Sequence, residues 1–144
     1  MKLLSALFFF LLPSTEIVEI VDAFHQLKTE KEEIAFIKSH KTSKTPEILG
    51  YVYATEMKQA SYTFNPYKKL KIFKETKHKL NALIAQNPSN LHLRYIRLLL
   101  QERTPGILGY NEFIEEDKSI LSSFTYPNSK VAYLYYYIQH NTSL

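Results

Sequence analysis

Cysteine and tryptophan are absent from this sequence, and glycine occurs only 3 times in 144 residues. The lack of cysteine excludes disulfides and thiolate metal sites, so the fold must be stabilised by its core. A chain of this length buries roughly 68–70% of the surface that it exposes when unfolded, which is sufficient for such a core. With 45% hydrophobic and 22% charged residues, the composition is that of a globular protein and not of a disordered one.

Motifs of known catalytic chemistry are absent too. The sequence has no G-x-S-x-G motif, no Walker loop and no dinucleotide-binding fingerprint. No histidine has a second histidine or a carboxylate three or four residues after it, as in helical metal motifs. The acidic cluster Glu112, Glu115, Glu116 and Asp117 is interpreted as the first turn of a helix, whose dipole these acids stabilise. We therefore expect no enzyme, no metal and no cofactor; an enzyme with a site assembled from distant residues is kept as a third hypothesis.

Strand-like alternation of apolar and polar residues is missing as well, and the repeated pattern is helical. From Thr15 onward the apolar residues follow one helical face, and Thr29 with Glu32 forms a capping box that predicts a second helix. Further helices are predicted where Asn or Thr caps a first turn, often before a Pro, which needs no N–H there. These starts are Thr45-Pro46, Asn65-Pro66, Asn87-Pro88, Asn111-Glu112 and Asn128-Ser129.

The helix expected after Asn87 is apolar on more than one side, which is typical of a central helix. The intervals between the predicted helix starts are unequal, which does not favour a regular repeat. From the predicted helices and the lack of strand-like alternation we expect an all-α fold with essentially no strand. Five to seven short antiparallel helices should stack as helical hairpins, either tetratricopeptide-like or as an irregular bundle.

The first residues have the form of a secretory signal peptide. Met1-Lys2 gives a positive start, ten mostly apolar residues follow from Leu3 to Leu12, and Pro13 breaks the run. The run is too short to span a bilayer, which needs ~20 apolar residues. We expect residues 1–14 to be the signal peptide, residues 15–144 to be one all-helical domain, and the protein to be periplasmic or extracellular. An uncleaved anchor and an N-terminal core helix are the alternatives, and the cleavage site stays open.

One segment carries a family-like pattern. Leu49-Gly50-Tyr51-Val52-Tyr53 matches the L-G-x-x-Y core in the first helix of the tetratricopeptide repeat, and the chain resembles that family in its paired helices with Asn-Pro between them. The resemblance implies that Gly50 allows close packing and that Tyr53 fills the groove of a neighbouring helix. The whole chain is also similar in style to small exported helical proteins of bacteria that have no assigned activity.

The strongest charge feature is a run of six lysines between Lys68 and Lys79, in a chain of net charge +4. They are Lys68, Lys69, Lys71, Lys74, Lys77 and Lys79. The plain interpretation is the solvated face of a helix. The functional one is a basic surface for an anionic membrane or nucleic acid, to which Arg94, Arg97 and Arg103 would add if the neighbouring helix presents them on the same side.

Tyrosine is the most conspicuous residue of the last predicted helix, with four in the five positions 133–137. Their rings either cover the edge of the core or form a surface for a partner. The leading hypothesis is a non-enzymatic interaction or structural protein outside the cytoplasm, which binds a protein or peptide partner through helix grooves; a membrane surface is the alternative contact, and nucleic acid is not favoured. The expected partner-binding residues are Tyr51, Tyr53, Arg94, Arg97, Tyr133, Tyr136 and Tyr137.

Overall fold

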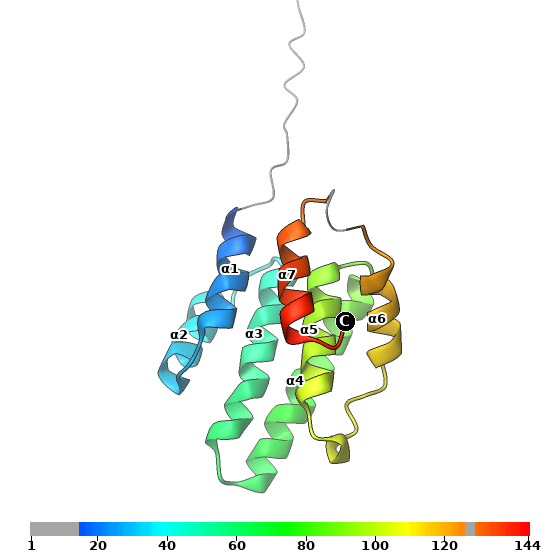
Figure 1. Cartoon of the computed structure of the whole chain (residues 1–144). Coiled ribbons are helices and arrows are strands. Elements are labelled where there is room, and N and C mark those ends of the chain that lie inside the picture. Colours follow the sequence, from blue (N-terminus) through cyan, green and yellow to red (C-terminus); the bar gives the residue numbers. More distant parts are fainter. Residues whose placement is uncertain (1–14, 126–128) are drawn as a thin grey trace, which may run out of the picture.

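The protein is all-α in a computed structural model that describes residues 15–125 and 129–144 (Figure 1). The expected signal peptide, residues 1–14, and the predicted cap Asn128 lie outside the described residues. Within them are seven α-helices, two short 3-10 helices and no strand, which confirms the predicted fold class. The helices are α1 (Thr15–Gln26), α2 (Glu30–His40), α3 (Pro46–Lys58), α4 (Pro66–Gln86), α5 (Leu91–Arg103), α6 (Ile114–Ser122) and α7 (Ala132–Asn141). The 3-10 helices are η1 (Gln59–Tyr62) and η2 (Gly106–Leu108).

Helices α2, α3 and α4 begin where the capping pattern of the sequence predicts. At α2 the hydroxyl of Thr29 accepts from the backbone N–H of Glu32, and the carboxylate of Glu32 accepts from the backbone N–H of Thr29, so the predicted capping box is confirmed. At α4 the side chain of Asn65 accepts from the N–H groups of Tyr67 and Lys68. Thr45 precedes α3 as predicted, although its side chain makes no capping hydrogen bond.

Two predicted caps were wrong. Asn87 ends α4, where its side-chain amide donates to the carbonyl of Leu83, and the cap of α5 is Asn90, whose side chain accepts from the N–H of Leu93. Helix α6 begins at Ile114 after Phe113, not at Asn111. The reason for this second shift is tertiary, because the N–H of Phe113 donates to the side chain of Gln101 in α5 at 2.9 Å.

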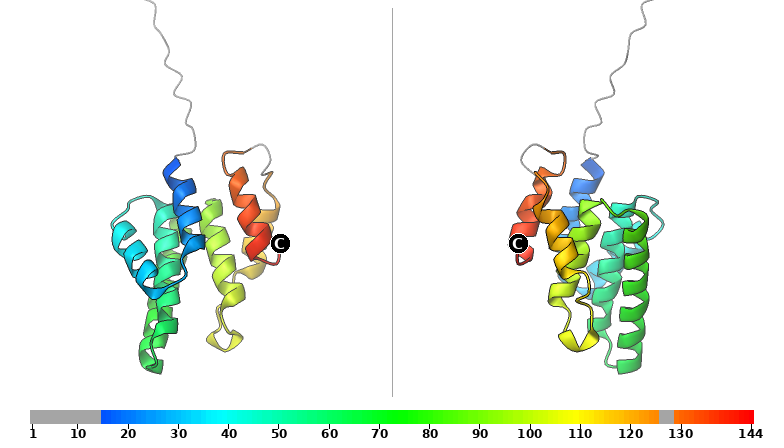
Figure 2. Two further views of the ribbon diagram at one scale, coloured as in Figure 1. Left: turned by 60° about the vertical axis from the view of Figure 1, so that its left-hand side comes forward. Right: turned by 90° about the vertical axis from the view of Figure 1, so that its right-hand side faces the viewer.

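Helix α5 is central, as the sequence predicted. Ten of its 13 residues are buried, and it packs against α3, α4, α6 and α7. Helix α3 in turn packs against α1, α2, α4 and α5. Figure 2 shows α1 to α4 on one side of the molecule and α5 to α7 on the other. The core therefore lies along the α3–α5 contact.

Gly50 permits the close approach of these two helices. A Cβ atom at Gly50 would lie 2.5 Å from Cδ2 of Leu93 and 2.9 Å from Cδ1 of Ile96, closer than packed side chains allow. The glycine in the L-G-x-x-Y segment therefore lets α5 lie directly on α3.

One end of the molecule consists of loops. It is the lower end in Figure 1, and we call it the loop end: residues 59–67, from η1 into the first turn of α4, and residues 104–109, around η2. Helix α5 stops there because Thr104 bonds back to the carbonyl of Leu100 and Pro105 follows. Gly109, with a left-handed φ of 64°, ends η2 and reverses the chain toward α6.

Candidate functional site

A pocket of about 860 Å³ opens at the loop end, which we call the loop-end pocket. Its walls come from α1, α3, α4, α5 and α7 and from both 3-10 helices, so it joins segments that are far apart in the sequence. Most of its lining is apolar, including Phe24, Leu27, Met57, Leu70, Phe73 and Leu99. Pockets of ~300–1,000 Å³ with apolar walls and a few polar groups are typical binding sites.

The charged groups of the loop-end pocket are cationic. Lys58, Lys69 and Arg103 line it together with His25, and no Asp or Glu is among its lining residues. Lys58 pairs with Glu33 of α2 at 2.9 Å, whereas Lys69 has no ion-pair partner among the described residues. Arg103 makes one long hydrogen bond, of 3.4 Å, to the side chain of Asn141. The pocket is thus suited to an apolar body with a negative group at its edge.

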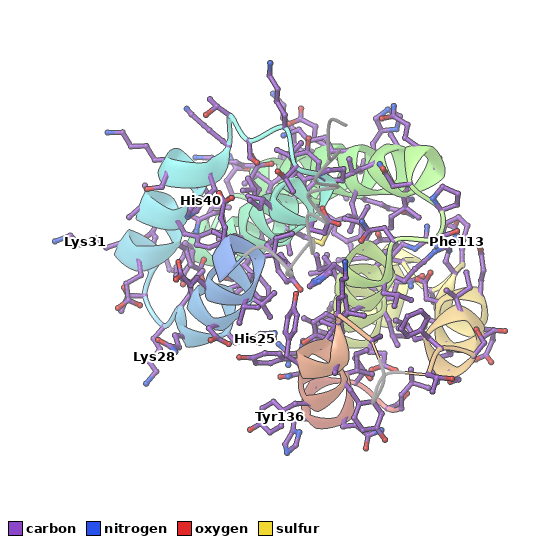
Figure 3. All side chains as sticks on the ribbon, turned by 90° about the horizontal axis from the view of Figure 1, so that it is seen from above. His25, Lys28, Lys31, His40, Phe113 and Tyr136 are labelled. Atoms are coloured by element: carbon purple, nitrogen blue, oxygen red, sulfur yellow. The ribbon has the colours of Figure 1, made fainter. Side chains whose placement is uncertain are left out.

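His25 lines the pocket and contacts two tyrosines. Its Nε2 is 2.9 Å from the hydroxyl of Tyr95, and its ring stacks on that of Tyr137 with centroids 4.3 Å apart. Tyr137 in turn donates to the carboxylate of Asp22, one turn before His25 on α1. Figure 3 shows His25 between α1 and α7. Burial lowers the pKa of His25 to about 4, and the charge of Arg103 acts in the same direction. The imidazole is therefore neutral at pH 7.

A second histidine joins α3, α5 and α7 in the interior. The ring of His92 lies 2.9 Å from the hydroxyl of Tyr51 at Nδ1 and 2.9 Å from that of Tyr133 at Nε2, so both ring nitrogens are satisfied. One nitrogen of a neutral imidazole donates and the other accepts, which suits two hydroxyl partners. Burial lowers the pKa of His92 to about 4 and raises that of Tyr133 to about 12. This arrangement fixes α7 against the rest of the fold.

Arg94, Arg97 and Asp117 form a buried ionic cluster between α5 and α6. Asp117 is fully buried and accepts from Nε and Nη2 of Arg97, at 2.8 and 2.7 Å, and from Nη1 of Arg94 at 3.0 Å. Gln101 completes the set with a hydrogen bond of 3.0 Å to the same carboxylate. The guanidinium of Arg97 also lies 4.0 Å from the ring centroid of Phe113. The cluster attaches α6 to the central helix.

The sequence interpretation of the acidic cluster missed this role of Asp117. Helix α6 does begin with Glu115, Glu116 and Asp117, but Asp117 points inward to the two arginines. A signal was available: Arg94, Arg97 and Gln101 are spaced by three and four residues, so they share one face of an otherwise apolar helix. A buried polar stripe of this kind needs a charged partner.

The structure places the seven expected partner-binding residues in three settings, none of them in the loop-end pocket. Tyr51, Arg94 and Arg97 are buried and bonded within the chain. Tyr53, Tyr133 and Tyr137 are partly buried, the first under Lys79 at 5.1 Å and the others in the two histidine arrangements. Tyr136 is 59% exposed on the outward side of α7 (Figure 3), and its ring stacks on that of His140.

The lysine run divides along α4. Lys77 and Lys79, further up the helix, pair with Glu112 at 3.0 Å and with Glu56 at 2.8 Å. Lys68 and Lys69, in the first turn, and Lys74 have no ion-pair partner among the described residues, and Lys71 is 3.9 Å from Glu75. The unpaired charge of this helix therefore lies in the half nearer the loop end.

In the part of the chain that the structure describes, no helix is long and apolar enough to cross a membrane. The same residues hold no group of three or more His, Cys, Asp or Glu side chains arranged to bind a metal ion. Comparisons with protein-family models, with curated proteins and with solved structures found no match to this chain.

Proposed function

We propose that this chain is a non-enzymatic binding protein, and that the loop-end pocket holds an apolar segment of a protein or peptide partner. The observation that carries the proposal is the pocket itself, about 860 Å³ with mostly apolar walls between helix ends. Amphipathic segments bind in such grooves between helices by inserting apolar side chains spaced three or four residues apart.

The charges of the pocket support binding over catalysis. General acid–base chemistry needs a group that gains and loses a proton near the working pH. Lysine and arginine are cationic at pH 7, the neutral ring of His25 is bonded to Tyr95, and no carboxylate lines the pocket. Lys69 and Arg103 instead favour a partner that carries a carboxylate beside its apolar side chains.

In this proposal the expected tyrosines act in two ways. Tyr51, Tyr133 and Tyr137 position α1 and α7 through His92 and His25, and so keep the inner wall of the pocket in place. Tyr136, exposed on α7, is an additional contact for a larger partner.

Two further parts of the proposal come from the sequence. The L-G-x-x-Y segment in α3, with the close approach at Gly50, supports a tetratricopeptide-like origin for the α3–α4 hairpin. The apolar run after Lys2 supports export with removal of residues 1–14. Sequencing the N-terminus of protein from cell fractions tests the second point: an intact Met1 in the cytosolic fraction would contradict it.

The binding proposal is tested by selecting peptides from a random displayed library against the folded protein. We expect the selected peptides to combine apolar side chains three or four residues apart with at least one Asp or Glu. Ala60→Trp places an indole at the pocket wall and should weaken the selected peptides at least tenfold. The matched control is Ala82→Trp, on an exposed position of α4 outside the pocket, which should bind as the wild type does.

Two results would contradict the binding proposal. One is the absence of any enriched peptide. The other is equal affinity of the wild type and the Ala60→Trp variant while both retain the helical circular dichroism and the melting temperature of the fold. Equal affinity would place the binding surface elsewhere on the molecule.

A further inference from the structure

Three large apolar side chains at the loop end are almost fully exposed to solvent. Phe64 is 101% exposed, Ile107 is 95% exposed and Tyr67 is 84% exposed, and we call them the tip residues. Phe64 and Tyr67 lie at the start of α4, and Ile107 lies in η2. Pro66 and Leu108, which are close to the tip residues in the sequence, both line the loop-end pocket. The two loops that carry the tip residues therefore flank the opening of this pocket. Figures 1 and 2 show both loops at the same end of the molecule.

Folding does not account for these exposed side chains. The turn before α4 is specified by Asn65 and Pro66, which cap and begin the helix whatever residue precedes them. A fully exposed Phe64 contributes no packing to the fold, and its apolar surface stays in water. Clustered apolar side chains of this kind mark a contact with another surface.

The two segments that carry the tip residues are positively charged. Residues 59–74 contain four lysines and no acid, and residues 103–111 contain one arginine and no acid. Acids near this end are already engaged: Glu75 lies 3.9 Å from Lys71, and Glu33 of α2 is paired with Lys58. Lys68 and Lys69 have no ion-pair partner among the described residues, and apolar tips beside such lysines are complementary to an apolar phase covered by negative groups.

We propose that the loop end docks on an anionic lipid bilayer. Phe64, Tyr67 and Ile107 enter the boundary between headgroups and acyl chains, and Lys68, Lys69 and Lys71 lie against the lipid phosphates. We favour a bilayer over a protein partner because the tip residues protrude from two separate loops. A fluid bilayer can admit both loops, whereas a protein partner would need two preformed pockets at the matching spacing. A bilayer is favoured over nucleic acid because phosphate contacts require the lysines but give no role to an exposed Ile107.

This proposal does not rest on the peptide-binding function: the tip residues, Lys68 and Lys71 do not line the pocket, and Lys69 alone of the named residues belongs to both surfaces. The test is cosedimentation of the full chain with vesicles of phosphatidylcholine, alone or mixed with an equal part of phosphatidylglycerol. Because residues 3–12 are themselves mostly apolar, the informative comparison is between variants of the same full chain.

The wild type should bind the mixed vesicles more tightly than phosphatidylcholine alone, and added salt should weaken the binding. The double variant Phe64→Ser with Ile107→Ser should lose at least tenfold in vesicle affinity. Its matched control is Ile34→Ser with Tyr135→Ser, two exposed apolar residues of α2 and α7, which should bind as the wild type does.

The lysines are tested with Lys68→Gln and Lys71→Gln, neither of which lines the pocket. Each should weaken binding about fivefold, from about 1 kcal/mol per lysine near an anionic surface. Lys31→Gln and Lys38→Gln, on exposed positions of α2, are the controls and should have a smaller effect. The double variant Phe64→Ser with Ile107→Ser should keep its affinity for the selected peptides, because neither residue lines the pocket, so failure of the pocket proposal is distinguishable from failure of this one.

Several outcomes would overturn the membrane proposal. Equal vesicle binding by the wild type and the tip variant would do so, as would equal affinity for vesicles with and without phosphatidylglycerol. Tight binding of a short oligonucleotide that the tip variant retains would assign the lysines to nucleic acid. A dimer in analytical ultracentrifugation that the tip variant abolishes would assign the tips to a second copy of this chain.

Discussion

Asp117 is the residue on which the attachment of α6 most depends. It is fully buried and accepts four hydrogen bonds, three of them from the guanidinium groups of Arg94 and Arg97. Removing one member of a buried ionic cluster leaves the other charges desolvated and unpaired, which typically costs about 3–5 kcal/mol.

We therefore expect Asp117→Ala to lower the free energy of unfolding by about 3–5 kcal/mol, measured by urea denaturation at pH 7. Glu115→Ala is the control, because Glu115 is an exposed acid in the same helical turn and has no ion pair with a described residue. A loss for Asp117→Ala no larger than that for Glu115→Ala would show that the cluster does not stabilise the fold.

The buried histidines make the stability depend on pH. The pKa of His92 is lowered from 6.5 to about 4 in the folded protein, so between these values the unfolded state binds the proton and the folded state does not. Stability is then fully present above pH 6.5 and declines as the pH falls toward 4. For His92 alone the loss reaches about 3 kcal/mol at the lower limit, and His25 adds a loss in the same direction.

This dependence is measured by urea denaturation between pH 7 and pH 4.5. His92→Gln keeps a side chain that donates and accepts hydrogen bonds but does not titrate, so its stability should change less over this range than that of the wild type. Parallel profiles of the two proteins would contradict the assignment of the pH dependence to His92.

Among the elements, the α3–α5 contact is the closest in the core. Gly50→Val would push a side chain into Leu93 and Ile96, so we expect a loss of about 1–3 kcal/mol in the free energy of unfolding. Gly106→Val is the matched control, because no atom lies within 4 Å of a Cβ there and its φ is ordinary. A melting temperature for Gly50→Val equal to that of the control would mean that α3 and α5 do not pack as closely as described.

The sequence predicted the helices better than their boundaries. Thr29 and Asn65 cap as expected because the bonds that they make lie within one helical turn. Between Asn87 and Asn90 the local pattern could not decide, since both residues can cap and only Asn90 also reaches Glu47 of α3, at 2.8 Å. The start of α6 was misplaced because Gln101, in another helix, supplies the partner of the N–H of Phe113. Local signals thus set the elements, and tertiary contacts decide between neighbouring caps.

At the scale of the whole molecule, the candidate site is formed by tertiary contacts that the sequence pattern does not predict. The loop-end pocket joins Phe24 of α1, Leu70 of α4, Leu99 of α5 and Leu108 of η2, which are widely separated along the chain. Helical periodicity identifies the apolar face of each helix, but it does not identify the place where the apolar faces of several helices leave a pocket between them. For the same reason the expected partner-binding set contained Arg94 and Arg97, whose burial depends on the packing of α6.

The central claim is that the loop-end pocket is where this protein binds its partner. The most direct measurement is a nuclear magnetic resonance titration of the ¹⁵N-labelled protein with a peptide from the display selection. The account predicts chemical-shift changes that concentrate at pocket residues such as Leu70, Leu99 and Leu108 and that disappear in the Ala60→Trp variant. Changes centred on the exposed face of α7, around Tyr136, with the pocket resonances unmoved, would contradict it.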